Sequence, residues 1–427
     1  MTTDPGNSLW RASTVERLET PPLACDRQVD LAIVGGGFTG CSAALEAARM
    51  GASVALFEAN SFAHGGSGRN VGLVNAGLWL PPDTVLAQLG ETAGRRLMDV
   101  LGQGPQRVFD LIAREGIECE ATHAGTLHLA HSAAGMKDLA RRHRQGNRVG
   151  APVQLLDAGE TARRTGSQAF HGALLDPRAG TVQPLAYCNG LARAAQRAGA
   201  ELHEHSPVRA LRRDGSDWLL EVNGHRVRAG ALLLATNAYH MGLDAPARPV
   251  SSIVHYSQFA TAPLPDDMRA RILAGGEGCW DTALVMSSFR MDAAGRLIVG
   301  GMGKASGPGS RIHAGWARRK LRQIYPELAK MPFEYQWYGR IAMTSDHVPK
   351  VLRFGPRACT IFGYSGRGIV PGTIFGTAAA QALLQDAPEA FPLAVQDSYH
   401  ERFTGLRTAW FELGATLFHA VRPLPFT

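Results

Sequence analysis

The sequence predicts an α/β fold, and three observations support this prediction. A run at residues 29–34 that is apolar except for Asp30 is typical of a parallel strand buried on both faces, and three consecutive glycines end it. Patterns typical of strands and of helices then alternate along the chain. The 49 glycines and 24 prolines exceed what a helical bundle carries and indicate many tight turns. At roughly 150 residues per domain, the length favours two domains.

The N-terminal βαβ unit is the clearest element. After the glycines, small and apolar residues predict a helix that ends at Gly51, and residues 53–57 predict the second strand. Residues 1–27 contain several prolines and no sustained period, so we expect an irregular segment on the domain surface.

The later elements follow from the same rules. We expect helices over much of residues 86–148, around a short strand at 125–130, then a helix at 185–198 and a strand at 201–205. Residues 207–227 predict antiparallel strands, and 231–235 a buried apolar strand. Beyond them we expect strands at 284–290 and 296–300, a helix at 314–325, a strand at 360–362 and a helix at 373–385.

The turn Gly35-x-Gly37-x-x-Gly40 lies between the first strand and the first helix. The first glycine allows the tight turn, the second admits a pyrophosphate to the backbone, and the third lets the helix pack on the strand. Glu58 ends the second strand, where its carboxylate can accept hydrogen bonds from both ribose hydroxyls of an adenosine and would repel a 2′-phosphate. This combination predicts a dinucleotide site and disfavours NADP.

Two further glycine loops favour FAD over NAD. The segment from His64 to Gly72 can run along a long, extended dinucleotide with its backbone N–H groups donating to it. The loop from Gly363 to Gly368 precedes a helix whose positive end would stabilise negative charge on a reduced flavin. No second G-x-G-x-x-G follows a later strand, which argues against a separate pyridine-nucleotide site.

Taken in order, these motifs resemble the D-amino-acid oxidase superfamily over nearly the whole stretch 30–384. The resembling segments are residues 31–40, Glu58, 66–70, 234–238, 337–346 and 363–368. Within the superfamily the chain is most similar to bacterial oxidases of the γ-glutamylputrescine oxidase and L-pipecolate oxidase type. The resemblance implies hydride transfer from the carbon next to nitrogen to flavin N5, an imine product, and reoxidation of the flavin by O2 with release of peroxide.

The resemblance also implies a set of FAD-binding residues. Val208 matches the residue whose backbone meets the adenine, and Gly366, Gly368 and Ile369 match the loop at the flavin edge. The remaining expected cofactor residues are Gly35, Gly37, Phe38, Thr39, Gly40, Glu58, Ala59, Ser67, Gly68, Arg69, Asn70, Gly72, Thr236, Gly363 and Thr373.

Three positions depart from the sarcosine oxidases of this superfamily. Gly339 matches the cysteine that links covalently to their flavin, so we expect a non-covalent flavin. Ile298 matches the lysine that activates O2, which makes an oxidase less firmly implied than a flavoprotein. Val370 matches the lysine that binds the substrate carboxylate, so such a group needs another partner.

The substrate-side candidates are chosen for their chemistry. A guanidinium can bind a carboxylate through two hydrogen bonds, which nominates Arg340, Arg367 and Arg69. Aromatic side chains can form the wall of an amine site; Tyr256 and Tyr364 rank first, ahead of Trp280 and Trp337. Hydride transfer from a neutral amine needs no strong base, so no catalytic acid or base is assigned.

The expected architecture is therefore α/β, with a Rossmann-type FAD-binding domain of the glutathione-reductase kind and an interleaved antiparallel-sheet (α+β) substrate domain. We expect the FAD-binding domain at 28–85, 149–240 and 339–390 and the substrate domain at 86–148 and 241–338. Residues 1–27 and 391–427 are a lead-in and a C-terminal tail.

Composition argues against several other classes of protein. The net charge of +7 comes from scattered residues, so we expect no nucleic-acid partner. The six cysteines contain no C-x-x-C pair, and His203 and His205 have no identifiable third ligand, so we expect neither disulfides nor a metal. No long apolar run or leader is recognisable, which predicts no membrane span and a cytoplasmic location.

The sequence leaves two alternatives to an oxidase. One is a flavin-dependent amino-acid dehydrogenase that passes electrons to a quinone or carrier, and the other is a tRNA-modifying or non-catalytic flavoprotein. The substrate, its stereochemistry, the carboxylate-binding residue and the oligomeric state are open at this stage.

Overall fold

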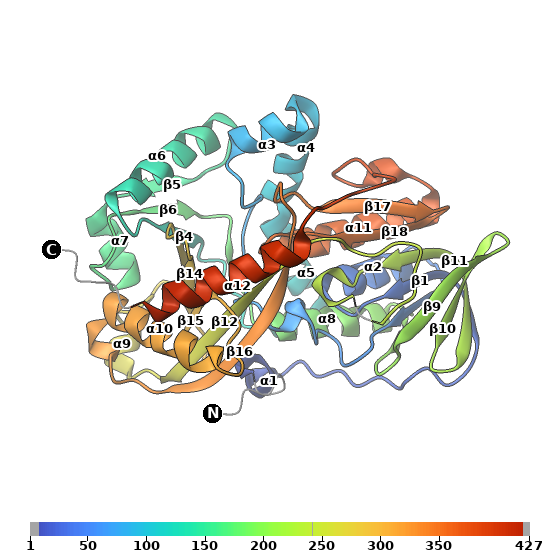
Figure 1. The fold of residues 1–427 in the computed structure, drawn as a ribbon, viewed down its shortest axis with the longest axis horizontal. Helices are drawn as coiled ribbons and strands as arrows, with labels where there is room; N and C mark the ends of the chain where they lie inside the picture. Colours follow the sequence, from blue (N-terminus) through green and yellow to red (C-terminus); the bar gives the residue numbers. More distant parts are fainter. Residues whose placement is uncertain (1–7, 241, 422–427) are drawn as a thin grey trace.

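The computed structural model describes residues 8–240 and 242–421, which build two eight-stranded sheets (Figure 1). In the first sheet the strand order is β17-β18-β11-β1-β2-β8, and β9 and β10 extend it beyond β11. Its strands are β1 (Arg27–Val34), β2 (Val54–Phe57), β8 (Glu201–His203), β9 (Val208–Asp214), β10 (Asp217–Val222), β11 (His225–Leu234), β17 (Lys350–Gly355) and β18 (Ala358–Phe362).

Strand β1 is the parallel centre of this sheet, paired with β2 on one side and β11 on the other. Its alternate residues enter two different cores: Leu31 and Ile33 pack in one, Ala32 and Val34 in the other. The predicted burial on both faces is confirmed. The first core also contains α2 (Phe38–Arg49), α8 (Pro184–Arg197) and α11 (Ile369–Gln385).

The second sheet is mainly antiparallel, with the order β16-β12-β15-β14-β13-β4-β6-β5. Its strands are β4 (Thr126–Leu129), β5 (Gln154–Leu156), β6 (Ala173–Asp176), β12 (Ser252–Pro263), β13 (Gly278–Asp281), β14 (Ser287–Met291), β15 (Arg296–Met302) and β16 (Phe333–Met343). The helices that accompany it are α6 (Ala133–Arg148), α7 (Ala158–Thr165), α9 (Asp266–Arg269), α10 (Gly309–Ile324) and α12 (Thr404–Ala420). The expected α/β fold with a second, largely antiparallel sheet is confirmed.

The expected domain boundaries need revision where they divide hydrogen-bonded or packed elements. Strands β5 and β6 belong to the second sheet, although the boundary at residue 149 assigns them to the first domain. Helices α4 (Glu91–Gly102) and α5 (Gly104–Glu115), expected in the second domain, pack on α11 in the first core. We propose that the first domain gains these helices and that the second gains β5 and β6.

The lead-in contains one element that the expectation of an irregular surface segment at 1–27 does not include, whereas residues 14–26 form no helix or strand and are largely exposed. Helix α1 (Leu9–Ser13) places Trp10 fully inside the first core. The Trp10 indole N–H donates to the Asn70 carbonyl at 2.8 Å, and its ring meets Trp337 edge-on at 5.7 Å. The helix is too short to produce a detectable period, so the sequence gives no sign of it. Residues 1–7 lie outside the described part.

The two longest strands, β12 and β16, were missed because their polarity does not alternate. On β12, Ser257, Gln258 and Thr261 are buried alongside apolar neighbours. The strand expected at 284–290 begins only at Ser287, and Leu284 before it is 94% exposed. Gln258 lines a cavity described below, whereas Ser257 and Thr261 hydrogen-bond to backbone groups of neighbouring segments.

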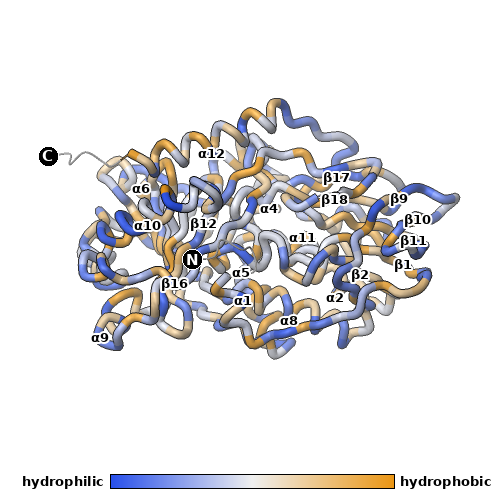
Figure 2. Tube along the Cα trace, turned by 60° about the horizontal axis from the view of Figure 1, so that its bottom comes forward, coloured by the Kyte–Doolittle hydropathy of each residue, from blue (hydrophilic) through white to orange (hydrophobic). Residues whose placement is uncertain are grey.

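Apolar residues recur along α12 as well as in the sheets (Figure 2). This helix belongs to the segment expected only as a tail, and it packs on β12 and α10. Within residues 8–240 and 242–421, no helix combines the length and hydropathy needed to cross a membrane.

Candidate active site

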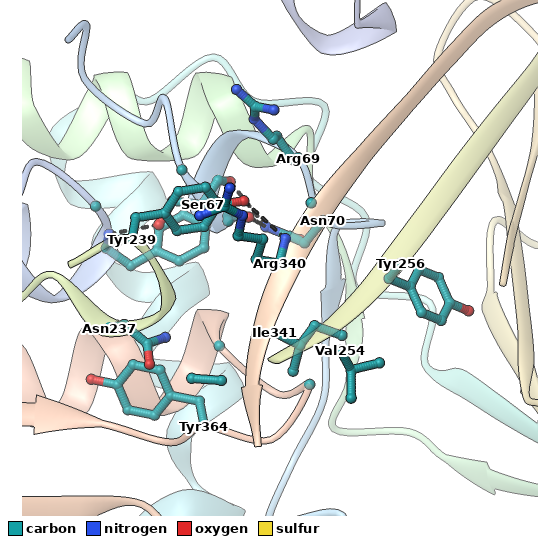
Figure 3. A pocket seen from close by; sticks show the side chains of 18 of the residues that line it. Ser67, Arg69, Asn70, Asn237, Tyr239, Val254, Tyr256, Arg340, Ile341 and Tyr364 are labelled. Carbon is teal, nitrogen blue, oxygen red and sulfur yellow. Dashed lines mark hydrogen bonds between the residues drawn. The ribbon is translucent and has the colours of Figure 1, made fainter. Parts of the chain in front are cut away.

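A cavity of about 600 Å³ is lined by residues of both sheets. On one side lie the turn after β1, the loop after β2 and the loop before α11; on the other lie β12, β13 and β16. In Figure 3 the side chains of Tyr239 and Arg340 are drawn beside each other, and Tyr256 is drawn apart from them on the right. The size of the cavity and its lining by both polar and apolar residues are typical of a cofactor and substrate site.

The glycine turn has the geometry that its spacing predicts. Gly35 has φ +110°, which favours glycine, and a Cβ on Gly40 would lie 2.0 Å from the Gly35 carbonyl oxygen. A Cβ on Gly37 would approach the Ser67 hydroxyl to 2.8 Å, and the Phe38 N–H donates to that hydroxyl at 3.0 Å. Helix α2 therefore packs tightly on β1, and its first residues, Phe38 and Thr39, line the cavity.

Glu58 is held by backbone donors at the end of β2. Its carboxylate accepts hydrogen bonds from the N–H groups of Gly36 at 2.8 Å and Asn60 at 2.9 Å. Burial raises the pKa of Glu58, and these two hydrogen bonds oppose the rise. The side chain lines the cavity beside Val208 and Ala59.

The loop after β2 is shaped by Asn70. Its amide nitrogen donates to the carbonyls of Gly66 and Ser67, and its oxygen accepts from the Gly72 N–H at 2.8 Å. A Cβ on Gly68 or Gly72 would meet a backbone oxygen at 2.4 or 2.1 Å, respectively. These two glycines therefore allow the loop to fold closely, while Ser67, Arg69 and Asn70 line the cavity.

The glycine loop at residues 363–368 precedes α11, and the start of this helix lies at the same cavity. Gly363 and Gly366 have φ of +81° and +92°, and Gly366, Gly368 and Ile369 line the cavity. The positive end of α11, which is 17 residues long, therefore faces it. Thr373 lies further along the helix, and its hydroxyl bonds to that of Tyr187 at 2.9 Å.

Most of the expected cofactor residues thus meet at one cavity. Those that line it are Gly35, Gly37, Phe38, Thr39, Glu58, Ala59, Ser67, Arg69, Asn70, Val208, Thr236, Gly366, Gly368 and Ile369. Gly40, Gly68, Gly72, Gly363 and Thr373 do not line it; the contacts described above give them supporting places in the turns and helices.

The two expected tyrosines line the cavity but are fixed differently. The Tyr256 hydroxyl donates to Ser288 at 2.9 Å, across the second sheet. The Tyr364 hydroxyl bonds to that of Thr39 at 2.7 Å, so only its ring is available to a substrate. Burial raises the pKa of both phenols, which keeps them protonated at neutral pH.

The arginine candidates are tied to protein groups. Arg69 donates to the His64 carbonyl at 2.7 Å, and Arg367 donates to the Ala76 carbonyl at 2.6 Å while covering the Trp280 ring at 5.5 Å. Burial lowers the pKa of Arg367 to about 10, yet the guanidinium stays charged at neutral pH, and its buried Nε has no partner among the described residues. Arg340 lies over the Tyr239 ring at 5.6 Å.

Comparison with known proteins identifies the family. Residues 30–382 match the family described as FAD dependent oxidoreductase, which includes the D-amino-acid oxidases. The chain belongs to this FAD-dependent oxidoreductase family. The resemblance inferred from the motifs is therefore confirmed, and FAD is the cofactor that the family implies.

Relatives of this family match along most of the chain. A probable oxidoreductase OrdL of Rhizobium meliloti (strain 1021) is 31% identical over 390 residues, covering 90% of each protein. The gamma-glutamylputrescine oxidoreductase of Escherichia coli (strain K12) is 28% identical and covers 89% of this chain and 88% of its own length. The crystal structure of glycine oxidase from Geobacillus kaustophilus has a TM-score of 0.70 at 23% identity and covers 88% of this chain and 100% of its own, which shows a shared fold.

Of the three positions that differ from the sarcosine oxidases, one lines the cavity and two do not. Gly339 lines it, whereas Ile298 and Val370 are fully buried and do not. Trp280 lines the cavity, but Trp337 is a core residue whose indole N–H donates to the Arg69 carbonyl at 3.0 Å. Trp337, a lower-ranked candidate for the substrate wall, therefore does not line the cavity.

Several cavity residues were not predicted from the sequence. Gln258 on β12 has a buried amide oxygen without a partner among the described residues, and the Tyr239 hydroxyl accepts from the Arg340 N–H at 2.9 Å. Tyr239 follows the predicted strand at 231–235 by four residues, a position that could have been chosen. Gln258 gave no signal, because its strand was not recognised.

The histidine pair that suggested a metal does not form one face of a strand. Strand β8 ends at His203, whose ring stacks on Phe57 at 5.5 Å, and His205 has φ +49° in the following turn. Among the described residues, no group of three His, Cys, Asp or Glu side chains is placed to hold a metal ion.

Proposed function

We propose that the chain oxidises the C–N bond of a secondary amine or amino acid, L-pipecolate-like or γ-glutamylputrescine-like, to an imine, with O2 as electron acceptor and H2O2 as product. One observation carries the proposal: Tyr256, Gln258 and Trp280 of the second sheet line the same cavity as the glycine turns of the first. The names of the relatives, gamma-glutamylputrescine oxidoreductase and glycine oxidase, support an amine or amino acid as substrate.

The residues around the cavity fit FAD. Gly35 and Gly37 line the cavity in the turn at the start of α2, where a helix N-terminus suits a pyrophosphate, and Glu58 lines it where it could accept hydrogen bonds from an adenosine ribose. Gly366, Gly368 and Ile369 would hold the flavin edge at the positive end of α11. When bound, the flavin supplies the two-electron acceptor that a C–N oxidation requires.

We propose that the flavin is bound non-covalently. Among the described residues that line the cavity there is no cysteine, and the matching position is Gly339. Precipitating the yellow protein with acid should leave the colour in the supernatant. Colour that stays with the precipitated chain would contradict the proposal.

The cavity favours a neutral amine as the reacting form. Glu58 is the one Asp or Glu among the described lining residues, and both its oxygens already accept backbone hydrogen bonds. No carboxylate on the substrate side is placed to hold an ammonium or to remove its proton. The value of kcat/KM should therefore rise with pH until the ammonium group of the unbound substrate has lost its proton.

An anaerobic titration tests the function. The visible flavin band should bleach when one of L-pipecolate, proline, sarcosine, γ-glutamylputrescine or a D-amino acid is added, and air should then restore it with one peroxide per turnover. Bleaching without peroxide would identify a dehydrogenase that passes electrons to a quinone or carrier. A flavin that none of these compounds bleaches would contradict amine oxidation and favour the tRNA-modifying or non-catalytic alternatives.

A tyrosine variant links the cavity to the reaction. Tyr256→Phe removes the hydroxyl that fixes Ser288, and we expect kcat/KM to fall about tenfold. Tyr335→Phe is the matched control, since Tyr335 is on the neighbouring strand but does not line the cavity. Equal activity of the two variants would contradict a role for Tyr256.

We propose that the reaction takes place in the reducing cytoplasm. All six cysteines are unpaired, and Cys41, Cys119, Cys188, Cys279 and Cys359 are buried as thiols. Such usage is typical of proteins kept in a reducing compartment. Fractionation of cells that express the chain at natural levels tests this location.

A further inference from the structure

The outward side of α12 is apolar. Every exposed residue of this helix is glycine, alanine or a large apolar residue. We define the α12 apolar face as seven exposed residues: Phe403 (71%), Leu406 (71%), Trp410 (72%), Leu413 (55%), Leu417 (56%), Phe418 (51%) and Val421 (64%). Among the described residues, only Val15 and Leu284 are other exposed large hydrophobics. A patch concentrated in this way marks an interaction site.

The apolar face is not needed to attach the helix, because the opposite side does so. The Thr408 hydroxyl accepts from the Ile253 N–H at 2.8 Å, and the Glu412 carboxylate accepts from the Lys304 N–H at 2.9 Å. The His419 ring stacks on Trp316 at 4.1 Å. Helix α12 is thus fixed to the second sheet and α10 by one side and presents the other to solvent.

The surroundings of the face are positively charged. Helix α10, which packs beside α12, carries five cationic residues and no acidic residue; three of them, Arg311, Arg318 and Arg322, are exposed. Both acids of segment 401–421 are engaged within the protein: Glu401 pairs with Arg407, and Glu412 binds His255 and Lys304. The face is therefore bordered by exposed cations and lacks an exposed carboxylate of its own.

The face also adjoins the candidate active site. Phe411, the neighbour of Trp410, lines the large cavity, as does Leu284, which is 94% exposed. An apolar surface thus reaches the cavity from α12 and from the loop before β14.

We propose that the α12 apolar face docks on an anionic lipid bilayer surface, with the helix lying along the plane of the membrane. Exposed Trp, Phe and Leu side chains on one face of a helix insert at the boundary between headgroups and acyl chains, and nearby Lys and Arg are attracted to anionic headgroups. This mode of binding needs no membrane-spanning helix. It also places the cavity next to the lipid.

A second copy of the chain fits the same face less well. In paired helices, charges of opposite sign beside the apolar face determine which helices associate. Two paired α12 helices would have no such pairs of charges beside their apolar faces. It would also bring the basic α10 helices of both copies toward one seam, where like charges repel. The charge pattern therefore favours lipid over a protein copy.

Vesicle sedimentation of the full-length, FAD-loaded protein tests the proposal. The protein should sediment with vesicles of equal parts phosphatidylglycerol and phosphatidylcholine, and about tenfold or more weakly with phosphatidylcholine alone or at high salt. The double variant Trp410→Ser/Leu413→Ser should lose about tenfold or more in binding. Val15→Ser is the matched control, because Val15 is an exposed apolar residue outside α12.

Three results would overturn the proposal. One is the absence of sedimentation with the anionic vesicles, and another is unchanged binding by the double variant. The third is a wild-type dimer in light scattering that the double variant converts to a monomer while neither binds vesicles, which would assign the face to a second copy. Peroxide or bleaching assays on the free protein report the proposed oxidation separately, so failure of either idea leaves the other testable.

Discussion

Replacing Glu58 with glutamine should weaken FAD binding and also cost some stability, because the glutamine NH2 would face one of the two backbone N–H groups that the carboxylate binds. Glutamine keeps the size of the side chain but removes its charge, and a hydrogen bond to a charged group contributes about 1.5–3 kcal/mol. If one such increment is lost at the ribose, the dissociation constant for FAD rises about 10- to 150-fold. The Glu58 carboxylate is already oriented by the Gly36 and Asn60 N–H groups, so little rearrangement should accompany binding.

Titration of FAD into the flavin-free protein, followed by quenching of flavin fluorescence, measures the effect. Glu221→Gln is the control, because Glu221 is an exposed acid on β10 of the same sheet. Burial raises the pKa of Glu58. As the pH is lowered, the affinity of the wild type for FAD should therefore begin to fall at a higher pH than the ordinary pKa of glutamate would give. The affinity of E58Q should not show this fall. An E58Q affinity for FAD within about twofold of that of the wild type would refute the ribose contact.

Three other changes test the fold. Gly40→Ala would place a Cβ 2.0 Å from the Gly35 oxygen and should lower the free energy of unfolding in urea by about 1–3 kcal/mol. Gly414→Ala is the control: its Cβ would have no atom within 4 Å, so it should stabilise the helix. Trp10→Ala should cost about 3–5 kcal/mol; an unchanged midpoint would show that α1 is dispensable. Burial lowers the pKa of His419 to about 3, and the unfolded chain takes up that proton near pH 6.5, so melting temperature should fall as pH drops from 6.5 and fall less in His419→Gln.

The sequence predicts the first sheet better than the second for a physical reason. Strand β1 is buried on both faces, so its run of apolar residues has no competing explanation. Strand β12 is buried as well, but it borders the cavity with Gln258 and Tyr256 and packs the core with Phe259. These polar residues of β12 therefore reflect the ligand site. They do not give the alternation of polar and apolar residues that is typical of a strand with one face exposed to solvent.

The site shows the same division. The glycines could be predicted because each serves a backbone geometry that few other residues allow, as the close contacts of Gly37 and Gly40 show. The roles of the arginines could not, because they depend on neighbours distant in sequence. Arg367 donates to Ala76 and covers Trp280, and no local pattern records either contact.

The order of strands in the first sheet has a consequence for synthesis of the chain. Strand β1 pairs with β11, and β11 pairs with β18, so the sheet joins residues near both ends of the sequence. At about 5–20 residues per second, β1 leaves the ribosome tens of seconds before β18. Until β18 is made, residues 232–234 of β11 lack the strand they pair with, although β10 already pairs with the first half of β11, and α11 is not yet available to cover the sheet. The growing chain must therefore be kept from aggregating until almost all of it has been made.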